Sequence, residues 1–266
     1  MRICFIGGGA MGEAMIKRLL IKGVITPVDV TVSDVSQPRR DTLNKRYGIN
    51  TTKSNREAIE RAEIIVLAVK PQDLNKVLGE IKGLSPQQLV LSIVAGATLD
   101  NLRKELAHPF IVRAMPNMPA QIGEGITVWL ATAETSQIQK DMAQSILAAL
   151  GEEICVNSEK YIDMATALSG SGPAYVFLVI EALTDAGVHV GLPRNIAEKL
   201  VIETMLGSTQ AVKTMGKHPA ELRNMVTSPG GTTTEGLLQL ETGGLRSLIL
   251  QAVIAAYNKA KNLGAK

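Results

Sequence analysis

The stretch from Thr227 to Gly236, TSPGGTTTEG, gathers five hydroxyl side chains around a Pro-Gly-Gly turn. A helical pattern follows at once, so the turn precedes a helix N-terminus. Backbone N–H groups and the helix dipole make such a place a ready site for an anion such as a carboxylate. The alternative is a capping motif, because Ser, Thr and Gly are common at helix starts. Capping accounts easily for one hydroxyl and poorly for five, so we predict an anion site.

A second glycine-rich turn, IGGGAMG at residues 6–12, contains the spacing Gly-x-Gly-x-x-Gly. It follows an apolar run and precedes a helical pattern, which is the context in which this spacing binds a dinucleotide. Glycines permit the tight turn and let the backbone approach a pyrophosphate at the helix N-terminus. A purely structural turn is the alternative, and the context favours the nucleotide.

Asp34 ends the second apolar run, where an acid commonly bonds the ribose 2′-OH of NAD. Ser33, Ser36, Arg39 and Arg40 lie close by in sequence and could instead hold the 2′-phosphate of NADP. A third possibility is that Asp34 only neighbours a helix cap and that the arginines form a solvated face. The choice between NADP(H) and NAD(H) therefore stays open.

Two further segments, AVKP at 68–71 and VAG at 94–96, end consecutive apolar runs. In open parallel sheets, ligands lie outside the carboxyl ends of the strands. We therefore expect a nicotinamide here, although Lys70 before Pro71 could simply be a strand terminus in a turn.

The remaining polar residues suggest little chemistry. The three histidines are scattered with no carboxylate or cysteine at ligand spacing, so we predict no metal site. The turn SGSGPAY at 169–175 fits ligand contact and close helix packing equally well. Cys4 and Cys155 lie in apolar stretches and are expected to be reduced core residues.

The elements that position these residues follow from the apolar pattern. Strands are predicted at 2–6, 28–34, 63–70, 89–96, 110–117, 125–131 and 152–157. Helices are predicted between them at 10–22, 36–47, 55–62 and 73–81. Continuous apolar runs are typical of strands buried on both faces, and alternation of strands and helices indicates a parallel sheet with right-handed crossovers. We therefore predict an α/β domain with a doubly wound parallel sheet over residues 1–160.

Residues 161–266 contain only helical patterns and form a predicted all-α second domain. Pro193 is expected at the first position of one helix, and His218-Pro219 opens another. The last helix, at about 245–263, is apolar on nearly every face between Leu248 and Tyr257. A small helical domain cannot cover such a helix from all sides, so we predict a homodimer or an oligomer of dimers.

Composition limits the class of protein. The 266 residues are 45% hydrophobic, and the net charge of +3 is scattered, which argues against nucleic acid as a partner. No run approaches the roughly 18 uninterrupted apolar residues of a membrane span. The first predicted strand begins at Arg2, which argues against a signal peptide. We expect a soluble cytoplasmic protein.

Five segments together resemble pyrroline-5-carboxylate reductase, and the likeness covers essentially the whole chain. They are IGGGAMG, AVKP, RAMPNMPA at 113–120, LSGSGPAYVF at 168–177 and PAELRNMVTSPGGTTTEGLLQLE at 219–241. The resemblance implies an N-terminal Rossmann-like domain and a helical domain for substrate binding and dimerisation. It also implies the last step of proline biosynthesis, in which NAD(P)H reduces 1-pyrroline-5-carboxylate to L-proline. That step needs positioning more than acid or nucleophile, because the substrate imine is readily protonated to an electrophilic iminium.

The resemblance also assigns roles. The Ser228 hydroxyl and the N–H groups from Gly230 to Thr233 would hold the substrate carboxylate, and Thr233 would bond the ring nitrogen as the catalytic residue. The substrate set is Ser228, Gly230, Gly231, Thr232 and Thr233. The cofactor set is Ile6, Gly7, Gly8, Gly9, Ala10, Met11 and Gly12, with Ser33, Asp34 and Asn55 at the adenosine end and Ala68, Val69, Lys70, Pro71, Ala95 and Gly96 at the nicotinamide end.

The first glycine motif also fits two other functions, a β-hydroxyacid dehydrogenase and a non-catalytic nucleotide sensor. A β-hydroxyacid dehydrogenase has a similar first motif but uses a lysine on the first long helix of its second domain. Residues 169–187 contain no Lys or Arg, which argues against that chemistry. A non-catalytic nucleotide sensor would be expected to lose the substrate loop, and SPGGTT is intact.

Overall fold

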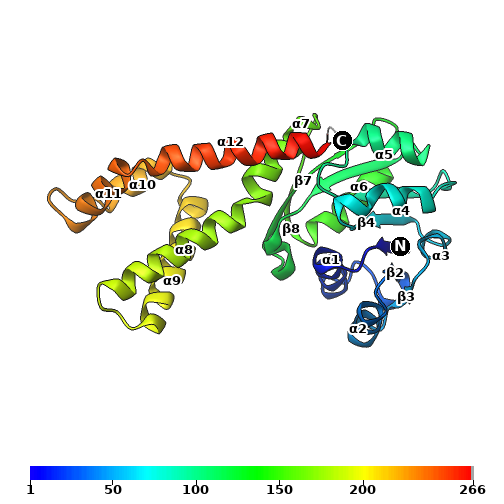
Figure 1. Ribbon diagram of the computed structural model, residues 1–266, viewed down its shortest axis with the longest axis horizontal. Helices are drawn as coiled ribbons and strands as arrows, with labels where there is room; N and C mark the ends of the chain where they lie inside the picture. The colour runs from blue at the N-terminus through cyan, green and yellow to red at the C-terminus, as the bar shows by residue number, and fades with distance from the viewer. Residues whose placement is uncertain (265–266) are drawn as a thin grey trace. The chain divides into compact units, whose positions relative to one another are not determined.

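The computed structural model describes residues 1–264, which form two compact units (Figure 1). One unit comprises Met1–Ser171 with Ala256–Lys266, and the other comprises Gly172–Ala255. The domain boundary that we predict after residue 160 precedes this division and stays a prediction. Each unit is described by itself.

The first unit is built on one eight-stranded sheet with the order β3-β2-β1-β4-β5-β6-β7-β8. The strands are β1 Ile3–Ile6, β2 Val30–Ser33, β3 Asn50–Thr52, β4 Ile64–Leu67, β5 Leu89–Ser92, β6 Ile111–Met115, β7 Gly125–Ala131 and β8 Gly151–Cys155. The helices are α1 Ala10–Ile21, α2 Gln37–Tyr47, α3 Asn55–Ile59, α4 Leu74–Glu80, α5 Leu99–Leu106, α6 Gln137–Ala148 and α7 Lys160–Ala165. The strand order reverses between β1 and β4, and in open α/β sheets ligands bind at such a switch point.

Apolar side chains fill both faces of the sheet. Phe5 packs in one cluster with Met15 of α1 and Leu147 of α6. Ile6, which points to the other face, packs in a second cluster that includes Leu78 of α4. Because β1, β4 and β5 are buried along their whole length, they read as continuous apolar runs. This doubly wound arrangement confirms the predicted fold class.

One pair of strands departs from the predicted parallel sheet. β6 and β7 are antiparallel, with Ala114 opposite Trp129, whereas β7 and β8 are parallel again. The connection from Met115 to Gly125 holds only a short 3₁₀ turn, η3 Met118–Ile122. A parallel crossover needs a dozen or more residues, so the chain reverses here instead.

Three smaller predictions were wrong. The short edge strand β3 was not predicted, because Asn50–Thr52 carries no apolar side chain. Cys155 is exposed and only Cys4 is buried, because Cys155 lies at the end of the edge strand β8. Pro193 caps α9 and does not occupy its first position.

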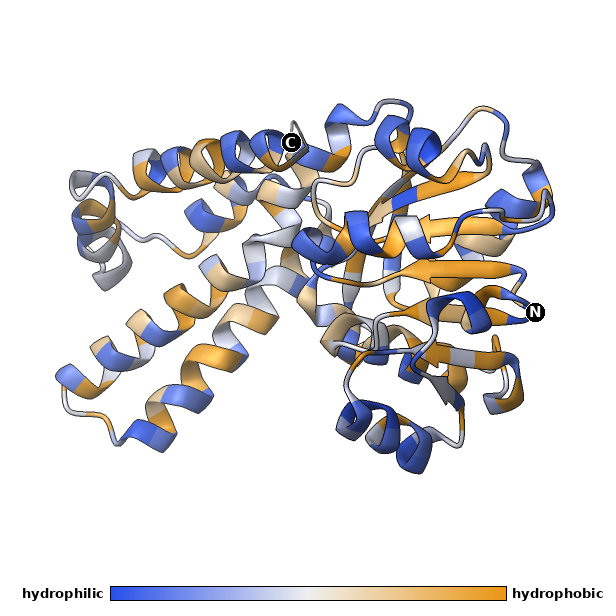
Figure 2. Cartoon of the chain, turned by 45° about the vertical axis from the view of Figure 1, so that its right-hand side comes forward, coloured by the Kyte–Doolittle hydropathy of each residue, from blue (hydrophilic) through white to orange (hydrophobic). Residues whose placement is uncertain are grey.

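The second unit is helical. The helices of the C-terminal part are α8 Gly172–His189, α9 Arg194–Met215, α10 Pro219–Met225, α11 Thr232–Thr242 and α12 Leu245–Gly264. α8 and α9 pack closely, since a Cβ added to Gly187 would lie 3.0 Å from the Ala197 Cβ. Between residues 172 and 255 only Thr184 and Ala197 are buried, and hydrophobic residues run along the helices (Figure 2). This unit therefore leaves most of its apolar surface uncovered within one chain.

One helical stretch, Lys160–His189, is long and apolar enough to cross a membrane by length and composition, and 6% of its most apolar window is buried. The sequence analysis predicted no membrane-spanning segment because it required an uninterrupted apolar run. This stretch contains Glu181 and Asp185 and so did not meet that criterion. A π-helical turn, Thr166–Gly170, lies within the stretch and contains part of the SGSG motif.

Candidate active site

The glycine loop before α1 is fixed by its packing. Gly7 has φ +99°, and a Cβ added to it would lie 2.7 Å from the Ala68 carbonyl oxygen. A Cβ on Gly12 would lie 2.6 Å from the Gly7 carbonyl oxygen. Both positions therefore require glycine, for conformation at Gly7 and for close approach at Gly12.

Gly9 differs from its neighbours in the loop. No atom lies within 4 Å of the place that a Gly9 Cβ would take, and Gly9 is the N-cap of α1 with no side-chain capping bond. The exposed Ala10 begins the helix, and Met11 is half-buried beside it. The open cradle at a helix N-terminus fits a dinucleotide pyrophosphate, which would bond the free N–H groups of the first turn.

The end of β2 carries the residues predicted for the adenosine side. Asp34 accepts hydrogen bonds from the Gly8 N–H (2.9 Å) and the Ser36 N–H (2.9 Å). The buried Ser33 hydroxyl donates to Asn55 Oδ1 at 2.6 Å, and Asn55 Nδ2 donates to Glu80 at 2.7 Å. Asp34 is thus joined to the glycine loop, whereas Ser33 and Asn55 bond each other.

Two arginines of α2 lie at the same end of the sheet. Arg39 donates to the carbonyl oxygens of Gly8 and Gly9 and pairs with Glu13. Arg40 is buried and donates to the Asp34 carbonyl oxygen at 2.5 Å. Burial alone would raise the pKa of Glu13, but hydrogen bonds from Arg39, Tyr47 and Arg46 outweigh it and lower that pKa. Glu13 is therefore ionised at neutral pH.

The strands β4 and β5 end earlier than predicted. The residues predicted for the nicotinamide side therefore lie in the loops that follow these strands. Ala68 and Val69 are half-buried, Lys70 and Pro71 are exposed, and Ala95 and Gly96 are half-buried. The Ala68 N–H donates to the Ile6 carbonyl oxygen at 2.9 Å, which joins the first loop to the start of the glycine loop. Gly96 has φ +78° and lies against Leu263 near the end of α12.

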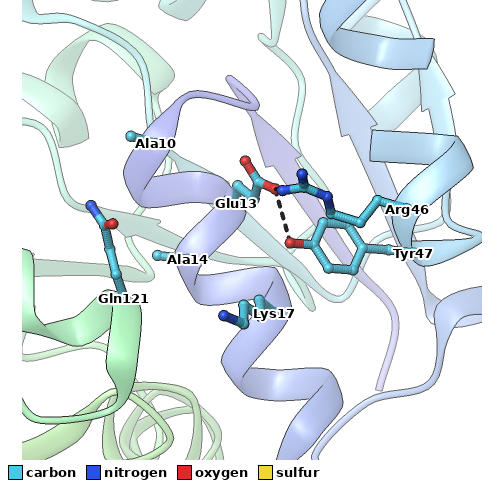
Figure 3. A pocket seen from close by; sticks show the side chains of 7 residues that line it. All are labelled: Ala10, Glu13, Ala14, Lys17, Arg46, Tyr47 and Gln121. Atoms are coloured by element: carbon cyan, nitrogen blue, oxygen red, sulfur yellow. Dashed lines mark hydrogen bonds and ion pairs between the residues drawn. The ribbon is translucent and has the colours of Figure 1, made fainter. Parts of the chain in front are cut away.

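A pocket of about 420 Å³ lies along α1 (Figure 3). Its lining residues are Ala10, Glu13, Ala14, Lys17, Arg46, Tyr47 and Gln121. Of the residues predicted for the cofactor, only Ala10 lines it. Arg46 and Tyr47 of α2 reach Glu13 at 2.7 and 2.9 Å. This cluster could not be predicted from the sequence, because α1, the end of α2 and Gln121 are far apart along the chain and meet only in the fold.

Arg113 forms a second cluster that the sequence analysis did not single out. Its buried side chain pairs with Glu159 (2.7 Å) and Asp163 (2.6 Å), and Glu159 also accepts from the Leu99 N–H at 2.7 Å. An arginine inside the apolar run FIVRAM was the available signal, because a buried charge needs partners. The cluster joins β6 to the start of α7.

The residues predicted for the substrate belong to the second unit, at the start of α11. Gly231 is the N-cap of this helix, with no side-chain capping bond. As the first helical residues, Thr232 and Thr233 have N–H groups with no acceptor inside the helix. The turn before them is held by the Ser228 carbonyl oxygen, which accepts from the Gly231 N–H and the Thr234 hydroxyl, while Gly230 has φ +66°.

The five hydroxyls of this segment divide into two groups. Thr227 and Thr234 donate to backbone carbonyls at 2.7 and 2.8 Å and so serve the loop itself. Within residues 1–264, no hydrogen bond engages the hydroxyls of Ser228, Thr232 or Thr233. Three hydroxyls and the first N–H groups of α11 are therefore available to a ligand.

The described residues contain no group of three or more His, Cys, Asp or Glu side chains that could hold a metal ion. The absence of a metal remains a prediction.

This chain is similar to known proteins along nearly its whole length. The family described as pyrroline-5-carboxylate reductase dimerisation matches residues 159–263, and that described as NADP oxidoreductase coenzyme F420-dependent matches residues 2–96. A pyrroline-5-carboxylate reductase from Synechocystis sp. is 44% identical over 261 residues, which are 98% of this chain and 97% of that protein.

Solved structures agree with this. A pyrroline-5-carboxylate reductase from Coxiella burnetii has a TM-score of 0.88 at 39% identity and covers 98% of each chain. A Plasmodium falciparum pyrroline carboxylate reductase with NADP bound has a TM-score of 0.92 at 34% identity, covering 99% of this chain and 98% of that one. Identity of this degree over the full length, with both glycine turns in place, shows that the chain belongs to the pyrroline-5-carboxylate reductase family.

Proposed function

We propose that this chain reduces 1-pyrroline-5-carboxylate to L-proline with NAD(P)H, the last step of proline biosynthesis. The observation that carries the proposal is the start of α11, where unpaired N–H groups and three free hydroxyls surround a glycine turn. Membership of the family supports it. The β-hydroxyacid dehydrogenase alternative is not favoured, because α8 carries no Lys or Arg.

The substrate carboxylate would lie at the N-terminus of α11. Of the N–H groups predicted from Gly230 to Thr233, that of Gly231 already donates to the Ser228 carbonyl oxygen, so the N–H groups of Gly230, Thr232 and Thr233 and the Ser228 hydroxyl would donate to the carboxylate oxygens. The positive end of the helix dipole favours the same charge, so no arginine is needed there.

Thr233 would act on the ring nitrogen. The ring nitrogen would enter protonated, as an iminium, and a nicotinamide bound at the predicted site would supply the hydride to the carbon of its C=N bond. As that C–H bond forms, the electron pair of the C=N π bond moves onto the nitrogen, which keeps its proton as an amine. A hydroxyl beside the nitrogen orients the ring during this change, and the rate gain is one of positioning.

The dinucleotide would lie across the first unit. Its pyrophosphate meets residues from Ile6 to Gly12 at the start of α1, where Gly9 leaves room. Ser33, Asp34 and Asn55 would line its adenosine end. Ala68 to Pro71, with Ala95 and Gly96, would line its nicotinamide end. The family relation supports NADP(H) as the cofactor, and the choice between NADP(H) and NAD(H) stays a prediction for titration with both.

The helical unit would assemble with a second copy. Exposed apolar side chains run along its helices, among them Leu248 and Leu250 at 60% and 61% exposure, and the dimerisation family covers this region. A homodimer or an oligomer of dimers covers these surfaces in the manner of obligate interfaces. We also propose a cytoplasmic location, which suits the two free cysteines.

A coupled assay tests the function. The purified full-length protein is given 1-pyrroline-5-carboxylate with NADPH and then with NADH, and absorbance loss and proline formation are followed together. We expect both signals to require the imine, in equal amounts. Binding of NADPH without any proline would instead support the non-catalytic sensor.

A further inference from the structure

Arg39 and Asp34 lie on the two sides of one residue of the glycine loop. The Asp34 carboxylate accepts from the Gly8 N–H at 2.9 Å, and the Arg39 guanidinium donates to the Gly8 carbonyl oxygen. A second nitrogen of Arg39 lies 3.4 Å from the Gly9 carbonyl oxygen. A group that approaches the end of β2 therefore meets one negative and one positive side chain.

Glu13 holds this arginine. Its Oε2 pairs with Arg39, and its Oε1 accepts from Arg46 at 2.7 Å and from Tyr47 at 2.9 Å. The two side chains of the Arg39–Glu13 pair are 27% and 16% exposed, so solvent screens the pair only partly. Figure 3 shows Glu13 on α1 facing Arg46 and Tyr47 of α2.

We propose that Glu13 determines the preference between NADPH and NADH by holding the Arg39 guanidinium. The inference rests on the proposed function, because it takes the glycine loop to bind a nicotinamide dinucleotide. The two cofactors differ only in the 2′-phosphate at the adenosine end. A guanidinium paired with Glu13 has less charge to offer that phosphate, and the Asp34 carboxylate on the other side of Gly8 repels it. NADH carries no such phosphate and is affected less.

Glu13→Gln tests this directly, since Gln removes the charge at nearly the same size and keeps one acceptor oxygen, which can serve Tyr47 in place of Oε1 while Arg39 loses its carboxylate partner. Isothermal titration of the full-length protein with adenosine 2′,5′-bisphosphate and with 5′-AMP isolates the contribution of the 2′-phosphate. We expect the affinity ratio of bisphosphate to monophosphate to rise about tenfold, because the Arg39 charge is no longer neutralised by Glu13 and attracts the 2′-phosphate at short range.

The matched control is Glu134→Gln. Glu134 also pairs with an arginine, Arg103, at 2.5 Å, and it lies between β7 and α6, away from the glycine loop. This variant changes the net charge of the same unit by the same amount. Its affinity ratio should equal that of the wild type. If the ratio rises as in Glu13→Gln, the effect comes from net charge alone and the proposal is overturned.

A double-mutant cycle identifies Arg39 as the residue through which Glu13 acts. Arg39→Met should lower the affinity ratio, and adding Glu13→Gln to Arg39→Met should then change nothing. An unchanged or lower ratio in Glu13→Gln, or the same gain without Arg39, overturns the proposal. Thermal unfolding of each variant shows that the fold is retained.

The nucleotide measurements are independent of imine reduction. If the protein makes no proline but Glu13→Gln still shifts the affinity ratio, the lack of proline refutes the proposed reaction and the shifted ratio supports the role of Glu13. Failure of the wild type to bind either nucleotide would overturn the role of Glu13, whatever the reaction.

Discussion

The chain contains two glycine-capped helix N-termini, and they differ in what holds them. The loop before α1 is fixed by its own unit: Gly7 packs on Ala68, and Gly8 bonds Asp34. The loop before α11 is held by bonds within residues 223–234, in a unit where only Thr184 and Ala197 are buried. The loop before α1 is thus supported by long-range contacts within one chain, whereas the loop before α11 has only local contacts in one chain. We infer that assembly completes the substrate site but not the cofactor site.

The largest expected effect comes from a charge on the uncovered surface. Leu250→Glu should dissociate the assembly, because a buried unpaired carboxylate costs about 3–5 kcal/mol in such an interface. Proline formation should fall with it, while NADPH binding by the first unit persists. Light scattering, a kinetic assay and titration with NADPH measure the three quantities.

Asn258→Glu is the control for that experiment, since it adds the same charge to an exposed position of the same helix. It should keep both assembly and activity. A fully active Leu250→Glu species at the monomer mass of 28.4 kDa would break the comparison between the two sites.

The next effect concerns the start of α11. Thr233→Ala should lower kcat by roughly ten- to hundredfold, since a hydrogen bond to a charged group contributes about 1.5–3 kcal/mol. Cofactor affinity should stay constant. Steady-state kinetics with both substrates varied checks this, and Thr242→Ala at the exposed end of the same helix is the matched control. A wild-type kcat in Thr233→Ala contradicts the role of this hydroxyl.

A pair of glycine variants sharpens the description of the first site. Gly7→Ala should destabilise the fold by about 1–3 kcal/mol, because alanine is strained at φ +99° and its Cβ meets the Ala68 carbonyl. Gly9→Ala has open space and φ −64°, so its stability should equal that of the wild type while NADPH binds more weakly. Chemical denaturation and titration separate the two outcomes. Equal stability in both variants would show that the loop is not fixed by packing.

The smallest effect is a pH dependence of stability that belongs to the first unit. Burial lowers the pKa of His108, and its hydrogen bond with the Gln88 carbonyl opposes this in part. The folded pKa lies below the unfolded value, so the unfolded chain binds more protons as pH falls. Stability is therefore full above the unfolded pKa of about 6.5 and declines below it.

Denaturation between pH 7 and pH 5 measures this decline, which should be smaller in His108→Gln. His189→Gln, at an exposed end of α8, should retain the wild-type slope. An identical slope in all three proteins would exclude His108 as its source.

Much of the fold could be predicted from local patterns. The spacing of Gly7, Gly9 and Gly12 after an apolar run is a short-range signal. The run from Leu248 to Tyr257 is apolar on nearly every face, which by itself predicts that one chain cannot bury all of α12. The start of α11 at Thr232 follows from the Gly-Gly pair before it. Such signals act within one turn or one helix, so the sequence carries them directly.

The rest depends on contacts between distant segments. The reversal at β6 and β7 follows from connection length and not from the apolar pattern of either strand. The pairing of Glu13 with Arg39, and of Arg113 with Glu159, appears only when the sheet brings α1 to α2 and β6 to α7. The roles of Thr233 and of the cofactor residues stay predictions, because hydroxyls available at a helix start do not by themselves identify a ligand.

Transfer of deuterium tests the central claim most directly. The protein is incubated with 1-pyrroline-5-carboxylate and NADPH that carries deuterium at both C4 positions of the nicotinamide, and the proline formed is examined by mass spectrometry and NMR. Direct hydride transfer predicts one deuterium per proline, bound to the former imine carbon. Proline that contains only hydrogen at that carbon, or cofactor oxidised with no proline formed, would contradict the proposed reaction.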